Sequence, residues 1–508
     1  MLHFEGWQGG AKGHRAIIII GSIFLALNIS ACRQNNAETP EDEAAKQLEQ
    51  LYRQHYLDAQ QQLDIIISES TDTTLADRLA HYYYGLGGKW MWMGEPDQLA
   101  KGDALDSLLH KEVKAMGFNE DLFGLKDLDS GLKAMHQPET VNGLPVTMAQ
   151  MEHNLTKAYL RYAVGQRYGF THPTKLFGKN NYDIEVEEVD SQFVANALWQ
   201  LRSKGRMLDF LSAAEPADSA YHRLKQELAK DNTKEIRERI LCNMERLRWR
   251  DKKHAKDADR YVFVNIASQQ VWAIGPDSVI NMRICCGKPA TKTPLLSSEI
   301  HRIEVNPEWG IPQSIIRNEM SYHAGDSAYF ARRNYYVTNS SGQRVNPATL
   351  TAGQLGSGRY SIRQRSGAGN ALGRIIFRFP NRFAVYLHDT SSPSAFKRDV
   401  RTVSHGCVRL QRPFEIAEFV LPQADPWLLD KMRLSMDLQP KTEQGREYKR
   451  SHGGAIRLIN NTSVEPKVPV VIDYYTLYPN PKTGTLDTWG DIYGYDPILL
   501  KAIKPYLP

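Results

Sequence analysis

Cys407 and His388 are the residues of this 508-residue chain whose types and spacing predict chemistry most directly. Cys407 stands in the stretch TVSHGCVRL (402–410), nineteen positions after His388, which follows the apolar run FAVYL. A thiol nucleophile needs a base that takes its proton and backbone N–H groups that stabilise an oxyanion. Gly406 permits a tight turn of N–H donors, and His388 paired with Cys407 would lower the pKa of the thiol. The segment therefore predicts a cysteine nucleophile, against the alternative that Cys407 is structural.

Two regions of different periodicity must position these residues. From about residue 45 to 235, apolar residues recur at three- and four-residue spacing, which predicts helices. From Tyr261 the period becomes two, which predicts strands in YVFVNIASQQVWAIG, SVINMRICCG and IHRIEVNPEW. GRIIFRFPNRFAVYLHD predicts a hairpin with Pro380 and Asn381 in its turn, and Pro413 predicts the first turn of a helix. We therefore expect an α+β fold, with a helical N-terminal domain followed by a β-rich domain.

Composition limits the class of protein. A chain with 42% hydrophobic and 24% charged residues can bury a large core and form several domains. The net charge of +5 is small for this length, and the basic residues form no long block. The sequence therefore gives little support to nucleic-acid binding and remains compatible with substrates that carry carboxylates.

The N-terminus has the layout of a bacterial lipoprotein signal peptide. Basic residues at 12–15 precede an apolar run at 16–27, which is short for a membrane span. Ser30 and Ala31 fit a signal-peptidase pocket, and Cys32 after them can be lipidated. The alternative is an uncleaved anchor with an incidental cysteine. Lipidation predicts an exported protein that is held to a membrane surface and faces the periplasm.

The other cysteines suggest packing. No CxxC pair or Cys/His spacing predicts a metal site. Cys285 and Cys286 are adjacent in a predicted strand, so their side chains point to opposite faces. A disulfide from Cys242 to either of them remains open.

The run of His388, fifteen intervening residues and Ser404-His405-Gly406-Cys407 resembles the signature of the YkuD-type L,D-transpeptidases, which cross-link bacterial peptidoglycan. Five further stretches resemble the large YcbB-like branch of this family, which carries a helical scaffold before the catalytic domain: NMERLRW, NPEWGIP, NALGRIIFRFPN, YLHDT and DIYGYD. Arg409 stands where smaller members have Asn and suits this branch. A peptidoglycan-binding module, which many members insert, is missing between SAYHRLKQELA and RERILCNMERLRW.

The resemblance implies a mechanism and its residues. Cys407 is the nucleophile and His388 the base, and the reaction needs no cofactor or metal. Cys407 attacks the carbonyl of diaminopimelate in a stem tetrapeptide, D-Ala leaves, and an amine of a second stem resolves the thioester into a 3→3 cross-link. The oxyanion hole and site wall comprise His405, Gly406, Ser404, Tyr386 and Asp389.

Three residues are candidates for substrate binding, each with a structural alternative. Arg409 suits a substrate carboxylate because its planar fork binds in a bidentate manner, or it forms a structural ion pair. Asn370 hydrogen-bonds substrate or caps a turn. Trp309 lines the cleft or anchors the base of a lid. The second SHGG, at 451–454, lacks a cysteine and is interpreted as a loop.

A long segment rich in Gly, Ser, Arg and Tyr predicts a mobile lid over Cys407, at about 313–365. Its candidates for contact with stem carboxylates are Arg363, Arg365 and Arg374, of which Arg374 has an outward-facing strand position as its alternative. The expected domains are a signal peptide at 1–32, a tether at 33–50, a scaffold at 51–235, a catalytic domain at 236–435 that includes the lid, and a C-terminal extension at 436–508 that packs on the catalytic domain.

Two other functions remain open. Water in place of the acceptor amine would make the protein an L,D-carboxypeptidase or hydrolase on the same substrate. A protein with a decayed site would be a wall-binding lipoprotein, although an intact Cys407 and His388 argue against decay. The expected partners are donor and acceptor stem tetrapeptides, the membrane through the lipid anchor, and other cell-wall enzymes.

Overall fold

The computed structural model describes residues 40–70, 74–93 and 96–508. The chain forms two compact units, Met1–Gln47 and Leu48–Pro508, and the description below concerns the second. The expected signal peptide, with Cys32, lies outside the described residues. Within those residues, every helix is too short or too polar to cross a membrane.

The N-terminal part of the second unit is helical, as the sequence predicts. Helices begin at residues whose side chains accept backbone N–H groups, such as Asp190, Ser203 and Thr233. Most of α5 is buried, and α2, α3, α4, α8 and α10 pack against it. The helices are α1 (Pro40–Glu69), α2 (Leu75–Gly85), α3 (Pro96–Ala115), α4 (Leu125–Met135), α5 (Leu144–Tyr168), α6 (Pro173–Phe177), α7 (Ser191–Gln200), α8 (Lys204–Ala214), α9 (Ser219–Leu228) and α10 (Lys234–Arg248).

The β-rich part is built on a nine-stranded sheet in the order β11-β3-β12-β10-β9-β4-β13-β1-β2. Because β2 also pairs with β3, the sheet closes on itself. The expected β1–β2 and β9–β10 pairings are both present. The strands are β1 (Tyr261–Asn265), β2 (Gln270–Ile274), β3 (Val279–Gly287), β4 (Leu296–Val305), β9 (Ile375–Arg378), β10 (Leu387–His388), β11 (Thr402–Ser404), β12 (Val408–Leu410) and β13 (Asn461–Asp473).

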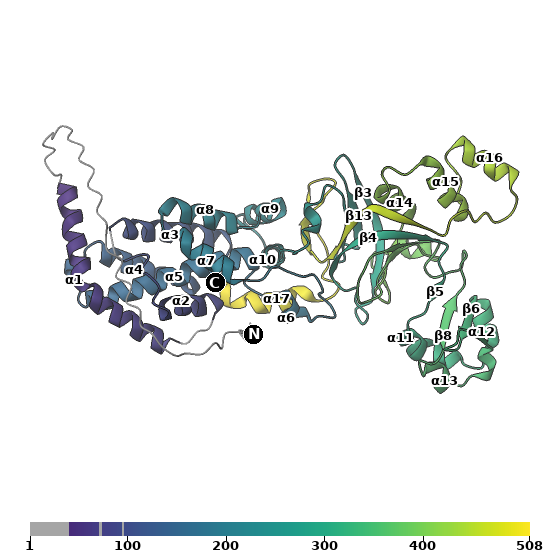
Figure 1. Cartoon of the computed structure of the whole chain (residues 1–508), viewed down its shortest axis with the longest axis horizontal. Coiled ribbons are helices and arrows are strands. Elements are labelled where there is room, and N and C mark those ends of the chain that lie inside the picture. The colour runs from purple at the N-terminus through teal and green to yellow at the C-terminus, as the bar shows by residue number, and fades with distance from the viewer. Residues whose placement is uncertain (1–39, 71–73, 94–95) are drawn as a thin grey trace, which may run out of the picture. The chain divides into compact units, whose positions relative to one another are not determined.

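The C-terminal region differs from the expected extension that packs on the catalytic domain. β13 lies inside the main sheet, antiparallel to β4 and parallel to β1, so the sheet is incomplete at residue 435. α17 (Tyr495–Ile503), drawn in yellow, lies against α10 and α6 of the helical part (Figure 1). The same region also holds β14 (Leu477–Pro479) and β15 (Leu486–Thr488). The last residues therefore join both parts of the molecule.

The lid is a folded domain rather than an irregular flap. It has its own sheet, in the order β5-β8-β6-β7, and its own hydrophobic core around Ile316, Phe330 and Ile362. We call residues 309–364 the lid domain. Its elements are β5 (Trp309–Gly310), α11 (Gln313–Ile315), α12 (Ser327–Arg332), β6 (Tyr335–Thr338), β7 (Arg344–Val345), α13 (Ala352–Gly356) and β8 (Ser361–Gln364).

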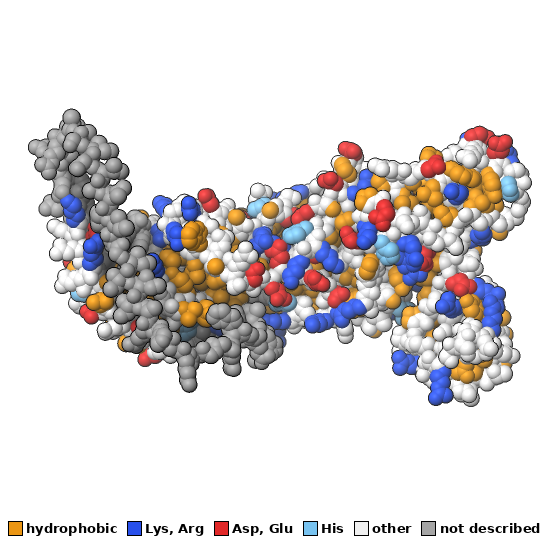
Figure 2. Space-filling view, in the orientation of Figure 1, with side chains coloured by type: hydrophobic (Ala, Val, Ile, Leu, Met, Phe, Trp, Pro, Cys, Tyr) orange, Lys and Arg blue, Asp and Glu red, His pale blue; other side chains and the backbone are white. Residues whose placement is uncertain are grey.

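Three helices follow β12: α14 (Pro413–Val420), α15 (Pro426–Ser435) and α16 (Glu443–Ser451). α14 has Pro413 at its first position, as predicted. The second SHGG begins at the last residue of α16 and continues into irregular structure. On the face seen in Figure 2, basic and acidic side chains are interspersed over the helical part and the sheet.

Candidate active site

Strand pairing places the predicted catalytic residues on one face of the sheet. β10 and β12 are parallel, with Leu387 opposite Val408 and His388 opposite Arg409. Leu387 and Val408 are fully buried in the main core. Because side chains alternate along a strand, His388 and Arg409 point to the other face, and so does Cys407, two positions before Arg409. The Val408 N–H donates to the Tyr386 carbonyl (3.0 Å), which extends this pairing toward Cys407.

The turn before Cys407 is held by Ser404. The Gly406 N–H donates to Ser404 Oγ (3.1 Å), and the Ser404 hydroxyl donates to the Cys407 carbonyl (2.6 Å). Gly406 has a φ of 121°, a conformation that other residues rarely adopt. Within the described residues, no acceptor takes the N–H of His405 or of Cys407. These two N–H groups are therefore available to a ligand, whereas the Gly406 N–H already donates to Ser404.

Burial disfavours the charged forms of both Cys407 and His388. His388 is buried, and this burial, together with the charge of Arg409, lowers its pKa to about 4. Burial also raises the pKa of the Cys407 thiol, against the opposing effects of the Tyr386 backbone and the Arg409 charge. The sequence predicted an ion pair that lowers the thiol pKa. The structure gives the opposite direction for the thiol pKa, because loss of hydration at this partly exposed side chain disfavours the thiolate.

Arg409 is the charged group that acts on both residues. It is half-buried, its Nε has no hydrogen-bond partner, and no acidic side chain among the described residues pairs with it. The structural ion pair, one of the two interpretations of Arg409, is therefore not formed. A half-buried guanidinium without an acidic partner favours an anionic ligand at this place.

The remaining candidates of the site wall have other partners. Asp389 Oδ2 accepts the Arg374 N–H (2.8 Å), and burial raises the pKa of this carboxyl. The Tyr386 ring is half-buried under the Arg378 guanidinium, 4.3 Å from the ring centroid. Asp389 therefore fixes the backbone beside His388, and the role of Tyr386 in the site wall stays a prediction.

Asn370 and Trp309 belong to the base of the lid domain. Asn370 Nδ2 donates to the carbonyls of Pro307 and Arg365, and its Oδ1 accepts the Leu372 N–H. Since this side chain is buried and both ends of its amide already form hydrogen bonds, the structure favours turn capping over substrate binding. Trp309 is half-buried against the core of the lid domain, so the structure favours the anchor over the cleft wall.

A contact between the lid domain and the catalytic turn was missed in the sequence. His405 Nε2 lies 2.6 Å from Glu319 Oε1, and Glu319 belongs to a short π-helix at Ile316–Met320. His405 is two positions from Cys407. Glu319 had no signal in the sequence, because it stands alone in a segment of unknown fold, 86 positions before its partner.

Comparison with known proteins agrees with this geometry. Residues 259–470 match the model of the YkuD L,D-transpeptidase catalytic domain, and residues 77–228 match the model of a scaffold domain. The chain thus carries a YkuD L,D-transpeptidase catalytic domain and a scaffold domain. A curated protein of Haemophilus influenzae named "Putative L,D-transpeptidase" is 26% identical over 298 residues, which are 57% of this chain and 55% of the relative. The match thus spans about half the length of that relative.

The lid domain is cationic. Between 309 and 364 the sequence has six arginines, no lysine and two acidic residues, and Arg365 follows directly. Arg363 lies 3.9 Å from Glu308, and Arg365 lies over the Tyr336 ring. Arg374, outside the lid domain, pairs with Asp437 (2.6 Å). Arg374 is therefore a structural residue. The arginines of the lid domain outnumber its acidic residues, so they can bind an anion.

Cys242, Cys285 and Cys286 are free thiols. Cys285 lies opposite Arg409 on β3 and is buried under Phe396, and Cys286 lies in the main core. Their opposite orientations confirm the alternation predicted for this strand. No disulfide joins Cys242 to either of them.

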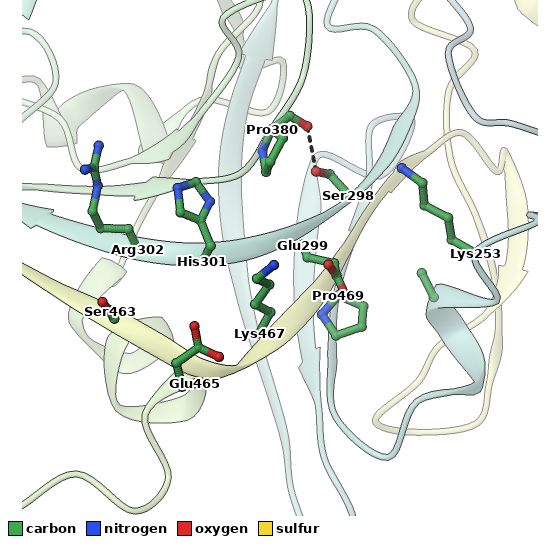
Figure 3. A pocket seen from close by; sticks show the side chains of 11 residues that line it. Lys253, Ser298, Glu299, His301, Arg302, Pro380, Ser463, Glu465, Lys467 and Pro469 are labelled. Carbon is green, nitrogen blue, oxygen red and sulfur yellow. Dashed lines mark hydrogen bonds between the residues drawn. The ribbon is translucent and has the colours of Figure 1, made fainter.

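Two other features lie apart from Cys407. A cavity of about 860 Å³ is lined by residues of β4 and β13, among them His301, Arg302, Glu465 and Lys467 (Figure 3). Neither Cys407 nor His388 lines it.

On α3 and α4, potential ligand atoms of Asp106, His110 and Asp129 lie within 4.8 Å of one another. All three side chains are at least partly exposed, and His110 already bonds Asp129 (3.0 Å), so this cluster forms a polar contact between two helices.

Proposed function

We propose that this transpeptidase forms 3→3 cross-links between peptidoglycan stem peptides through a thioester on Cys407. The observation that carries the proposal is the common face of Cys407, His388 and Arg409 beside a turn with two available N–H groups. A thiol, a neutral base, an unpaired cation and oxyanion donors together suit attack on a carbonyl next to a carboxylate.

The first half-reaction makes the thioester. The Cys407 sulfur bonds to the carbonyl carbon of diaminopimelate while His388 takes the thiol proton. The carbonyl oxygen becomes an oxyanion that the N–H groups of His405 and Cys407 stabilise. The C–N bond then breaks, and the His388 imidazolium gives its proton to the amine of the departing D-Ala.

The second half-reaction resolves the thioester. The side-chain amine of a second diaminopimelate attacks the thioester carbon, and His388 takes a proton from this amine. The C–S bond breaks and the proton returns to Cys407. The charge of Arg409 suits a carboxylate of the donor stem, and the arginines of the lid domain suit those of the acceptor.

The test is incubation of the purified protein with a disaccharide tetrapeptide, followed by mass analysis. A dimer that has lost one D-Ala supports the transpeptidase, and a tripeptide monomer alone would make the protein a carboxypeptidase. Cys407→Ala should abolish either product. Cys285→Ala is the matched control, because it removes a buried thiol from the same face and should keep activity. Turnover by Cys407→Ala would overturn the assignment of the nucleophile, and an inactive wild type would support the wall-binding alternative.

We also propose that lipidation of Cys32 holds the protein to a membrane that faces the periplasm. The support is the arrangement of basic residues, apolar run and Ser30-Ala31-Cys32 in the sequence. An anchored enzyme is confined near its polymer, and confinement can replace a wall-binding module.

A further inference from the structure

A buried threonine holds the turn that precedes Cys407. Thr293 is fully buried in the loop after β3. Its hydroxyl donates to the Gly406 carbonyl (2.8 Å) and accepts the Gly287 N–H (2.9 Å). A Cβ on Gly287 would lie 2.1 Å from the Thr291 carbonyl oxygen, so this loop is tightly folded. Thr293 is thus a fixed support of the catalytic turn.

The hydroxyl of Tyr493 completes this support from a distant part of the chain. It accepts the Thr293 N–H (3.0 Å) and donates to the Gly287 carbonyl (2.8 Å). Tyr493 is buried, and Lys292 Nζ donates to its backbone carbonyl (3.0 Å). One hydroxyl therefore satisfies two buried backbone groups of the loop that holds Gly406.

The segment that carries Tyr493 is fixed to the end of the helical part. The Tyr493 N–H donates to the Tyr474 hydroxyl (2.9 Å), and Asp491 accepts the N–H of Asp496 (2.9 Å). Asp496 in turn pairs with the buried Arg246 of α10 (2.7 Å). This network is polar and largely buried, so it resists small displacements.

The same segment then packs on the helical domain. After α17, Tyr506 packs against the rings of Phe118 and Phe170, with centroids 5.7 and 4.9 Å away. The Asn119 N–H donates to the Tyr506 carbonyl (2.7 Å). Residues 491–506 thus contact the helical domain at one end and the support of the catalytic turn at the other.

We infer that Tyr493 is a positioning residue for the oxyanion turn, and that it acts on Gly406 through Thr293. This inference rests on the proposed function of Cys407. By fixing the Gly406 carbonyl, the contact sets the plane of the next peptide, which contains the Cys407 N–H. The C-terminal segment in this way makes the helical domain a support for catalysis, in addition to its role in the fold.

The inference predicts different effects on two reactions of the Cys407 thiol. Acylation of Cys407 by a carbapenem forms an oxyanion and depends on the direction of the Cys407 N–H. Alkylation by iodoacetamide is a displacement at carbon that forms no oxyanion. A residue that only positions the turn should affect the first reaction and spare the second, whereas general damage to the site affects both.

The test compares Tyr493→Phe with Tyr495→Phe in the full chain. The hydroxyl of Tyr495 is buried without a hydrogen-bond partner, so its removal is a matched control. We expect Tyr493→Phe to slow carbapenem acylation by about 10- to 100-fold, with alkylation within about twofold of wild type. Tyr495→Phe should change neither rate. Both rates are measured as the mass increase of the intact protein with time.

A second pair of variants covers the event that Tyr493→Phe does not fold. Thr293→Val removes the hydroxyl that binds the Gly406 carbonyl, and Thr293→Ser restores it. The inference is supported if Thr293→Val is acylated slowly but alkylated normally, while Thr293→Ser is acylated at the wild-type rate. Equal losses in both reactions, or wild-type acylation by Tyr493→Phe and Thr293→Val, would overturn it. If wild type itself formed no adduct while Cys407 was alkylated, the proposed function would fail, and the inference with it.

Discussion

The neutral state of Cys407 and His388 predicts how the thiol responds to pH. Burial raises the thiol pKa above its ordinary value, so the thiol form of Cys407 predominates at pH 7. A thiolate–imidazolium pair would instead be almost fully ionised at pH 7. Since the thiolate is the nucleophile, the two states differ about 100-fold in their rate of alkylation at neutral pH.

The assay is the rate at which iodoacetamide alkylates Cys407 between pH 4 and 10, followed by peptide mass. We expect the rate to rise about tenfold per pH unit up to at least pH 9, without a plateau at low pH. Cys407→Ala measures the background from the other cysteines. Cys242, Cys285 and Cys286 are all buried, so this background should be low.

A fast plateau between pH 5 and 8 would refute the reasoning, because only a preformed ion pair keeps the thiolate charged there. Loss of that plateau in His388→Asn would identify the partner. Turnover gives a second measure. Since the pKa of His388 is lowered to about 4, its neutral form persists as the pH falls, and the acid limb of kcat/KM should lie near pH 4.

Three further predictions follow from the site. Arg409→Gln should lower kcat/KM for stem peptides by about 10- to 100-fold, since a buried charge-assisted hydrogen bond contributes about 1.5–3 kcal/mol; steady-state kinetics would contradict this with an unchanged value. Glu319→Gln removes the contact with His405 and should speed hydrogen exchange at the edge of the lid domain that faces the turn, while Glu308→Gln, which binds only within the lid domain, should not. Cys32→Ala should keep activity on soluble muropeptides and lower 3→3 cross-linking in cells, and full cross-linking by an exported, unlipidated variant would exclude the anchor as the cause.

Local patterns predicted the elements around the site well. The alternation in 261–274 gave β1 and β2, and Pro413 marked the start of α14. The neighbours Cys285 and Cys286 point to opposite faces, as strand geometry requires. Each of these predictions depends on residues close together in sequence. The change of period near residue 255 likewise separated the helical part from the sheet.

Long-range pairing was beyond such patterns. β13 enters the sheet between β1 and β4, about 200 and 165 positions from its partners. No local signal in the sequence therefore shows that the sheet continues beyond residue 435. The glycine-rich segment looked like a flap, because the apolar residues of its core are dispersed among polar ones. The role of Asn370 depends on the carbonyls that surround it, and a sequence does not show these.

The electrostatics of the site suggest why an unpaired arginine lies beside a buried base. In the free enzyme Arg409 helps to lower the pKa of His388, which makes the imidazole a weak base. A substrate carboxylate bound to Arg409 would cancel this charge and raise the pKa of His388 toward its ordinary value, so the base would strengthen when substrate is present. The acid limb of kcat, which reports the complex, should then lie at higher pH than that of kcat/KM, which reports the free enzyme. In Arg409→Gln the acid limbs of kcat and kcat/KM should lie at the same pH, because the charge that separates them is gone. Coincident limbs in wild type would show that substrate does not neutralise Arg409.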